Sequence, residues 1–159
     1  NRGWLHARLR RWGDAIADLT AAAGLDRTDP EPVLTRAAVL HRLGRHAEAL
    51  ADFDRAIALS PPHPEAHAAR AETRRELGDR AGALADLDRV LRIRPEHVPT
   101  LLARARILQA DGRDAEAIAA FDDVLALVDD QDARRGRALS ARRLRDVSAP
   151  HPAVPLPRA

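Results

Sequence analysis

LGRHAEALADFDRAIALSP, at residues 43–61, returns twice along the chain in altered form, as LGDRAGALADLDRVLRIRP at 77–95 and DGRDAEAIAAFDDVLALVD at 111–129. The second residue of each copy is a glycine, and the three glycines, Gly44, Gly78 and Gly112, are 34 residues apart. A fixed period of that length predicts stacked units whose cores close only against their neighbours, which favours binding over catalysis.

Four columns of like residues persist when the frame is moved back by one more period. The columns are Ala15, Ala49, Ala83 and Ala117; Leu19, Phe53, Leu87 and Phe121; Leu25, Leu59, Ile93 and Leu127; and Ala22, Ala56, Val90 and Val124. Within one unit they fall at helical intervals, so they predict the buried stripe of an amphipathic helix.

A second, more polar helix precedes that helix in each unit. In the second unit it is predicted from about residue 31 to residue 43, entered through Pro30 and ended by Gly44. Pro61 and Pro95 stand at the joins between units, and no run alternates like a strand. The predicted fold is therefore all-α, built of antiparallel helix pairs.

A 34-residue helix pair with glycine near its turn, alanine early in the second helix, leucine or phenylalanine in its middle and proline at the join resembles the tetratricopeptide repeat. The resemblance covers residues 1 to about 131 and implies a right-handed α-solenoid, a superhelix with units at 1–29 (truncated), 30–63, 64–97 and 98–131. The period argues against pentatricopeptide repeats, which read RNA bases.

Two units depart from the family pattern. In the third, His67 and Arg74 stand where a bulky aromatic and a tyrosine are usual, and Gly82 lies inside the following helix, at a cost of about 1 kcal/mol relative to alanine. We expect this unit to be the least stable. The first unit lacks the start of its opening helix, so we expect the chain to be a piece of a longer protein.

The distribution of charge separates the repeats from the C-terminal segment. The net charge is only +2, and the pI near 10.6 is high because the chain has no Lys, Tyr or Cys to titrate. Residues 132–146 hold six arginines and two aspartates, a net charge of +4; once these and Arg158 are subtracted, residues 1–131 carry −3. The repeats are thus mildly acidic and the segment that follows is basic.

We interpret residues 132–146 as a basic helix that caps the last repeat through Ala133, Leu139 and Leu144. Gly136 weakens this interpretation. The alternative is an arm that binds nucleic acid or an acidic partner. Residues 147–159, which are rich in proline, predict an extended tail.

Two charged columns follow the same period. Arginines recur at 2, 36, 70 and 104, and aspartates recur at 18, 52 and 86. Because an acidic column matches the basic one, we predict a ladder of ion pairs between adjacent helices rather than a basic stripe for an acidic ligand.

No constellation of residues predicts catalysis. His63 and His67 lie four residues apart but lack a third metal ligand, and the chain has no phosphate-binding glycine loop, no nucleophile elbow and no thiol. We therefore expect no metal, no cofactor and no catalytic residue, the alternative being a regulatory part of a larger enzyme. No segment approaches the roughly 20 apolar residues of a membrane span, and we expect a cytoplasmic protein.

The resemblance also implies where a partner would bind. In tetratricopeptide arrays the first helices of successive pairs line a concave groove that holds a peptide or partner protein. Carried over to this chain, the groove comprises Trp4, Arg8, Glu31, Leu34, Thr35, Ala38, His41, Arg42, Glu65, Ala68, Ala69, Glu72, Arg75, Glu76, Leu102, Ala103, Arg106 and Gln109.

One well-known ligand of the family is not expected to bind. Chaperone-binding members hold a terminal carboxylate with Lys, Asn and Arg side chains. Those places fall here on Leu34, Ala38, Ala69, Pro99 and Ala103 or, counted from the first unit, on Trp4, Thr35, Glu65 and Ala69. Neither register supplies the donors that a carboxylate requires, so we expect no such clamp.

Overall fold

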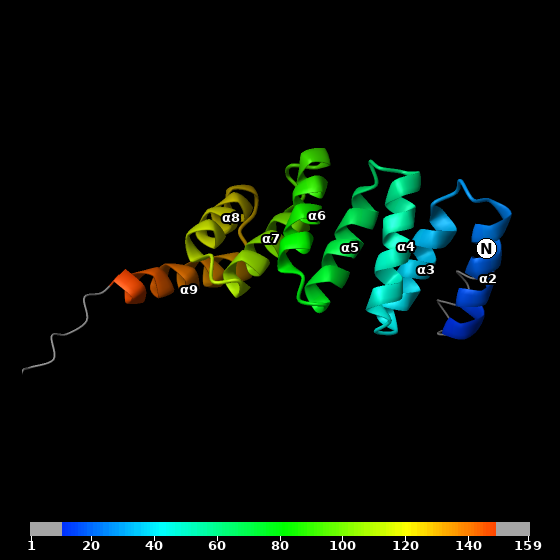
Figure 1. The fold of residues 1–159 in the computed structure, drawn as a ribbon. Coiled ribbons are helices and arrows are strands. Elements are labelled where there is room, and N and C mark those ends of the chain that lie inside the picture. Colours follow the sequence, from blue (N-terminus) through cyan, green and yellow to red (C-terminus); the bar gives the residue numbers. More distant parts are fainter. Residues whose placement is uncertain (1–10, 149–159) are drawn as a thin grey trace, which may run out of the picture. The chain divides into compact units, whose positions relative to one another are not determined.

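A computed structural model describes residues 11–148 of the chain, which contain eight α-helices and no strand (Figure 1). The helices are α2 (Trp12–Leu25), α3 (Glu31–Arg42), α4 (His46–Leu59), α5 (Pro64–Glu76), α6 (Arg80–Ile93), α7 (Val98–Ala110), α8 (Asp114–Leu127) and α9 (Gln131–Ser148). The all-α prediction is therefore confirmed.

The chain divides into two compact units, residues 1–100 and 101–159. In the first unit, α2 packs on α3, α4 packs on α3 and α5, and α6 packs on α5. In the second unit, which begins within α7, α9 packs on α8.

The helix boundaries follow the predicted period. The helices α2, α4, α6 and α8 begin at residues 12, 46, 80 and 114, which are 34 apart. Gly44, Gly78 and Gly112 have φ angles of 73°, 80° and 73°, the left-handed region in which a Cβ is strained. At Gly44 the amide donates to His41 O, and the next amide donates to Leu40 O. These bonds satisfy carbonyls at the end of the helix, so the glycine turns the chain back for the next one.

Two of the four apolar columns form the core as predicted, and a third does so with one exception. The alanines at 15, 49, 83 and 117 are fully buried, and the residues at 19, 53, 87 and 121 are at most 4% exposed. In the column of Ala22, the three later members are buried, whereas Ala22 is half-buried and its neighbour Ala23 takes the core position.

The prediction that the column of Leu25 is buried was wrong. Leu25 is 91% exposed, Ile93 and Leu127 are also exposed, and Leu59 is half-buried. Each of these residues lies six positions after the central core residue of its helix. Six residues correspond to a rotation of roughly 240° beyond that residue, so the side chain leaves the buried stripe.

The predicted ladder of ion pairs is present within the compact unit of residues 1–100. Arg36 Nε and Nη2 donate to the two oxygens of Asp52 at 2.7 and 2.6 Å. Thirty-four residues on, Arg70 Nε and Nη2 donate to Asp86 at 2.9 and 2.5 Å. These forked pairs join the two helices of a pair, α3 to α4 and α5 to α6.

A buried polar cluster fills the space between α5 and α6. His67, only 5% exposed, places Nδ1 at 3.1 Å from Asp86 Oδ1 and Nε2 at 3.3 Å from Pro61 O. Arg74 Nη1 donates to Asp86 Oδ2 at 2.8 Å and to Gly82 O at 3.2 Å. The two residues that depart from the family pattern thus meet on one carboxylate.

Gly82 has a structural reason that the helix-propensity argument lacks. A Cβ at this position would lie 2.1 Å from Asp79 Oδ2 and 2.9 Å from Arg74 Cδ. Asp79 caps α6 by accepting a hydrogen bond from Gly82 N at 2.9 Å. The missing side chain makes room for the cap and for the arginine.

Helix α9 packs closely on α8 where it carries Gly136. A Cβ there would lie 2.3 Å from Phe121 Cζ, so the glycine allows the two helices to approach. Ala133 is buried as predicted, whereas Leu139 and Leu144 are 45% and 38% exposed and are therefore only partly covered. Leu139 is turned by about 100° from buried Ser140. Leu144 follows Arg143, which donates to Gln109 O near the end of α7 and lies 3.7 Å from Asp114, the first residue of α8.

Candidate functional site

The surface shared by α3 and α5 is built on a continuous apolar core. Ala37, Leu40, Ala49 and Phe53 form a buried cluster, and Leu34 and Ala69 pack against it. Leu34 from α3 and Ala69 from α5 are therefore brought together, half-buried, as two residues of the predicted groove. Ala38 is exposed, while Thr35 and Ala68 are half-buried.

A histidine connects the two helices at this surface. His41 Nδ1 lies 3.0 Å from Thr73 Oγ1 of α5, and Thr73 Oγ1 donates to Ala69 O at 2.9 Å. The His41 ring also meets the His46 ring edge to face, with centroids 5.1 Å apart. Contacts on two sides, from Thr73 and from His46, thus hold this imidazole in place.

Paired charges lie on the exposed side of α5. Arg75 Nε and Nη2 donate to Glu72 at 3.0 and 2.6 Å, and Arg75 also pairs with Glu76. The hydrogen bond from Arg75 lowers the pKa of Glu72 below its ordinary value. Arg42, on α3, is exposed. The small apolar floor is therefore edged by charged side chains.

The two predicted glutamates at the helix starts have basic side chains beside them. Glu65 pairs with Arg94 Nη2 at 2.6 Å, and His63 lies 3.5 Å from Glu31 and 3.4 Å from Glu65. His63 Nδ1 also faces Ala66 N as the cap of α5. Within residues 11–148, no three His, Asp or Glu side chains are arranged to hold a metal ion.

In the second unit, two of the predicted groove residues of α7 contact α9. Gln109 Nε2 donates to Gly136 O at 2.7 Å and to Ser140 Oγ at 3.0 Å, and Arg106 pairs with Asp132 at 3.0 Å. Leu102 and Ala103 are half-buried. Trp4 and Arg8 lie outside the described residues.

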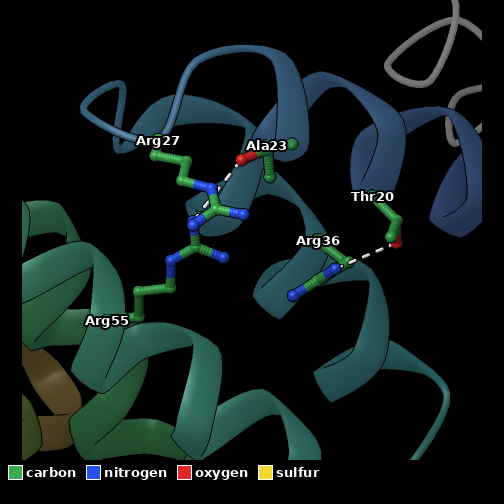
Figure 2. A pocket seen from close by; sticks show the side chains of 6 residues that line it. Thr20, Ala23, Arg27, Arg36 and Arg55 are labelled. Carbon is green, nitrogen blue, oxygen red and sulfur yellow. Dashed lines mark hydrogen bonds between the residues drawn. The ribbon is translucent and has the colours of Figure 1, made fainter.

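Sequence reasoning missed a pocket between α2 and α4. It has a volume of about 430 Å³ and is lined by Thr20, Ala23, Gly24, Arg27, Arg36 and Arg55 (Figure 2). Arg27 lies in the turn after α2, outside every repeating column that the sequence displays. The repetition of Arg55 as Arg89 was a visible signal, but only the fold shows that Arg55 and Arg27 share one hollow.

The helix pairs, their glycine turns and the conserved period of their boundaries place the protein among the helix-pair repeat proteins. Two sequence profiles of the tetratricopeptide repeat match residues 1–64 and 74–142. The chain belongs to the tetratricopeptide repeat family. A comparison with curated proteins finds no significant match.

Solved structures of other tetratricopeptide proteins share the fold. A crystal structure of MamA superposes with a TM-score of 0.82 at 15% identity, over 92% of this chain and 87% of that one. YrrB, described as having an unusual peptide-binding site, gives 0.80 at 16% identity, over 91% and 75%. The first repeat domain of Spaghetti (RPAP3), bound to the HSP90 peptide SRMEEVD, gives 0.66 at 27% identity, over 69% and 86%.

None of the helices between residues 11 and 148 combines the length and the apolar character that crossing a bilayer requires.

Proposed function

We propose that the chain is a non-catalytic scaffold that binds an extended peptide or a partner protein on the surface of α3 and α5. The observation that carries the proposal is the apolar surface of Leu34 and Ala69, which pack on one buried cluster beside the imidazole that Thr73 holds, with Ala38 exposed on the same helix as Leu34. Membership of a family that generally mediates protein interactions supports the same function. Small side chains admit the backbone of a ligand, and the charged edges would tune specificity.

The basic helix α9 supports a capping function better than nucleic-acid binding. Among the described residues, five of its six arginines lie within 4.0 Å of a carboxylate, and Arg145 alone has no acidic partner. Three of these acids, Asp114, Asp122 and Asp129, lie outside α9 in the same unit. A helix whose arginines are already paired with carboxylates of the same unit has few positive charges available to bind phosphates.

Peptide selection against the intact chain tests the groove. Peptides enriched from a random displayed library should lose binding at least tenfold to Ala38→Arg, because the new side chain fills the floor. Ala58→Arg changes another exposed alanine, on α4, and should leave binding unchanged. Enriched peptides that tolerate Ala38→Arg would place the binding surface elsewhere.

The same assay tests the predicted absence of a carboxylate clamp. The peptide SRMEEVD and its C-terminal amide should bind equally weakly, since none of the five clamp positions carries a donor. A marked preference for the free carboxylate would contradict this prediction.

A further inference from the structure

The pocket between α2 and α4 lies away from the proposed groove. One of its lining residues, Arg36, stands two residues before Ala38 on α3 and is therefore turned by roughly 200° from it around the helix axis. Its walls come from α2, from the turn that follows it and from α4 (Figure 2). A ligand in this pocket and a peptide in the groove would contact different sides of the first unit.

Between residues 11 and 148, two of the three arginines in this pocket find no acidic partner. Asp52 neutralises Arg36, whose Nη1 donates to Thr20 Oγ1 at 2.9 Å. Arg27 and Arg55 make no ion pair with any described residue, and Arg55 Nη2 only reaches Ala23 O at 3.4 Å. Figure 2 shows the two side chains extended toward one another from the turn and from α4. Like charges that share a hollow repel until an anion lies between them.

The turn that carries Arg27 is fixed by its own hydrogen bonds. Asp26 Oδ1 accepts from Thr28 N at 2.8 Å and from Thr28 Oγ1 at 2.7 Å, and Asp29 Oδ1 accepts from Glu31 N at 3.0 Å. The nearby carboxylates are thus committed to the backbone of the turn and leave the guanidinium of Arg27 available.

The next repeat provides an internal control for this charge. Thirty-four residues on, Thr20 corresponds to Asp54, Arg27 to Pro61 and Arg55 to Arg89. Asp54 accepts a bond of 2.6 Å from Arg70 Nη1, where Arg36 has only the Thr20 hydroxyl.

The pocket and its counterpart in the next repeat differ in net charge when the buried aspartate of each forked pair is included. In the pocket of Arg27 and Arg55, three arginines less Asp52 give a charge of +2. At the corresponding place in the next repeat, Arg70 and Arg89 are balanced by Asp54 and Asp86. The excess positive charge is therefore a property of this pocket, and the next repeat does not share it.

We propose that this pocket binds the phosphoryl group of a phosphorylated serine or threonine in a partner protein. A phosphate monoester carries close to two negative charges at neutral pH, which matches the two unpaired guanidinium groups. Its oxygens accept the forked hydrogen bonds that arginine donates, and a carboxylate would neutralise only half the charge. Leu25, next to Gly24 and 91% exposed, offers an apolar contact for a residue beside the phosphate.

Titration calorimetry on the full 159-residue chain tests the site. The probes are end-blocked tripeptides of glycine, a central residue and glycine, in which the central residue is phosphoserine, serine or glutamate. Only the phosphoserine peptide should bind saturably, with about a tenfold loss for Arg27→Gln or Arg55→Gln and a larger loss for the double variant.

Three controls decide the outcome. Arg89→Gln removes the equivalent arginine of α6 and should leave binding unchanged, as should Ala38→Arg in the proposed groove. Melting temperatures of the variants verify folding, which exposed positions 27 and 55 should not disturb. AMP, a phosphate monoester that is not a peptide, is titrated for comparison. Equal binding of the glutamate peptide, tighter binding of AMP than of the phosphoserine peptide, or insensitivity to both pocket substitutions would overturn the proposal.

Discussion

Asp86 is a single residue on which much of the α5–α6 contact depends. It is 2% exposed and accepts hydrogen bonds from Arg70 and Arg74, with His67 at hydrogen-bond distance. All three partners belong to α5. Removing the carboxylate leaves buried cationic and polar groups without their acceptor, which is costlier than removing a whole ion pair.

We predict that Asp86→Ala lowers the free energy of unfolding by about 3–5 kcal/mol in urea titrations. The matched control is Asp54→Ala, whose exposed carboxylate accepts only Arg70 Nη1 and should cost at most about 1 kcal/mol. Equal losses would show that Asp86 is no more than another surface acid.

The same residue should make stability depend on pH. Burial raises the pKa of Asp86, but hydrogen bonds from Arg70 and His67 and the charges of Arg70 and Arg74 outweigh burial and lower it below the ordinary 3.8. Because the folded pKa is the lower one, the stabilisation is complete above 3.8 and is lost as pH falls through the folded pKa.

Wild type and Asp86→Asn should therefore differ most in unfolding free energy near neutral pH, and the gap should narrow steadily below about pH 4. Denaturant titrations at a series of pH values measure the gap directly. A gap that stays constant down to about pH 2 would contradict the linkage.

At the scale of helices, the contact of α9 with α8 depends on a residue without a side chain. We predict that Gly136→Ala costs about 1–3 kcal/mol, because its Cβ would overlap the ring of Phe121. Gly13→Ala is the control, since no atom lies within 4 Å of its Cβ position in α2. That change should stabilise the chain by about 0.5–1 kcal/mol, as measured by thermal unfolding.

The helices themselves could be predicted from the sequence, since the period, the glycine turns and the alanine columns act over short distances. What local patterns lack is the neighbour across the contact. Gly136 looked like a weakness of α9 until Phe121 was seen to occupy its place. The column of Leu25 recurs every 34 residues, yet most of its members are exposed. Recurrence along the chain does not show which side of the helix a residue lies on.

At the scale of the whole molecule, the helix pairs should differ in local stability. The buried residues of α3 include Val33, Val39 and Leu40, whereas those of α5 are Pro64, Ala66, His67, Ala71 and Thr73. Helix α5 thus relies on polar contacts that contribute less to stability than apolar burial.

Amide hydrogen exchange followed by mass spectrometry should show peptides of α5 exchanging faster than those of α3. Asp86→Ala should widen that difference, because it removes the anchor of the polar cluster. Uniform protection over the two helices would refute the prediction that the third repeat, residues 64–97, is the least stable.

Family resemblance predicts a groove, but the contacts that its predicted residues make come partly from across helices. The link from His41 to Thr73 joins residues 32 apart in the chain, and Gln109 is engaged by a helix whose packing the repeat does not encode. The pocket of Arg27 and Arg55 was missed for the opposite reason. A comparison of repeats emphasises what the units share, and this pocket depends on how one unit differs.

The even spacing of the helix starts has a consequence for how such a chain changes length. Excising residues 64–97 would join His63 to Val98 and regenerate the His–Val junction that residues 97 and 98 already form. Duplication of the same segment would likewise create only a His–Pro junction, which residues 63 and 64 already form. Recombination within the gene could thus add or delete whole modules without inventing a new turn.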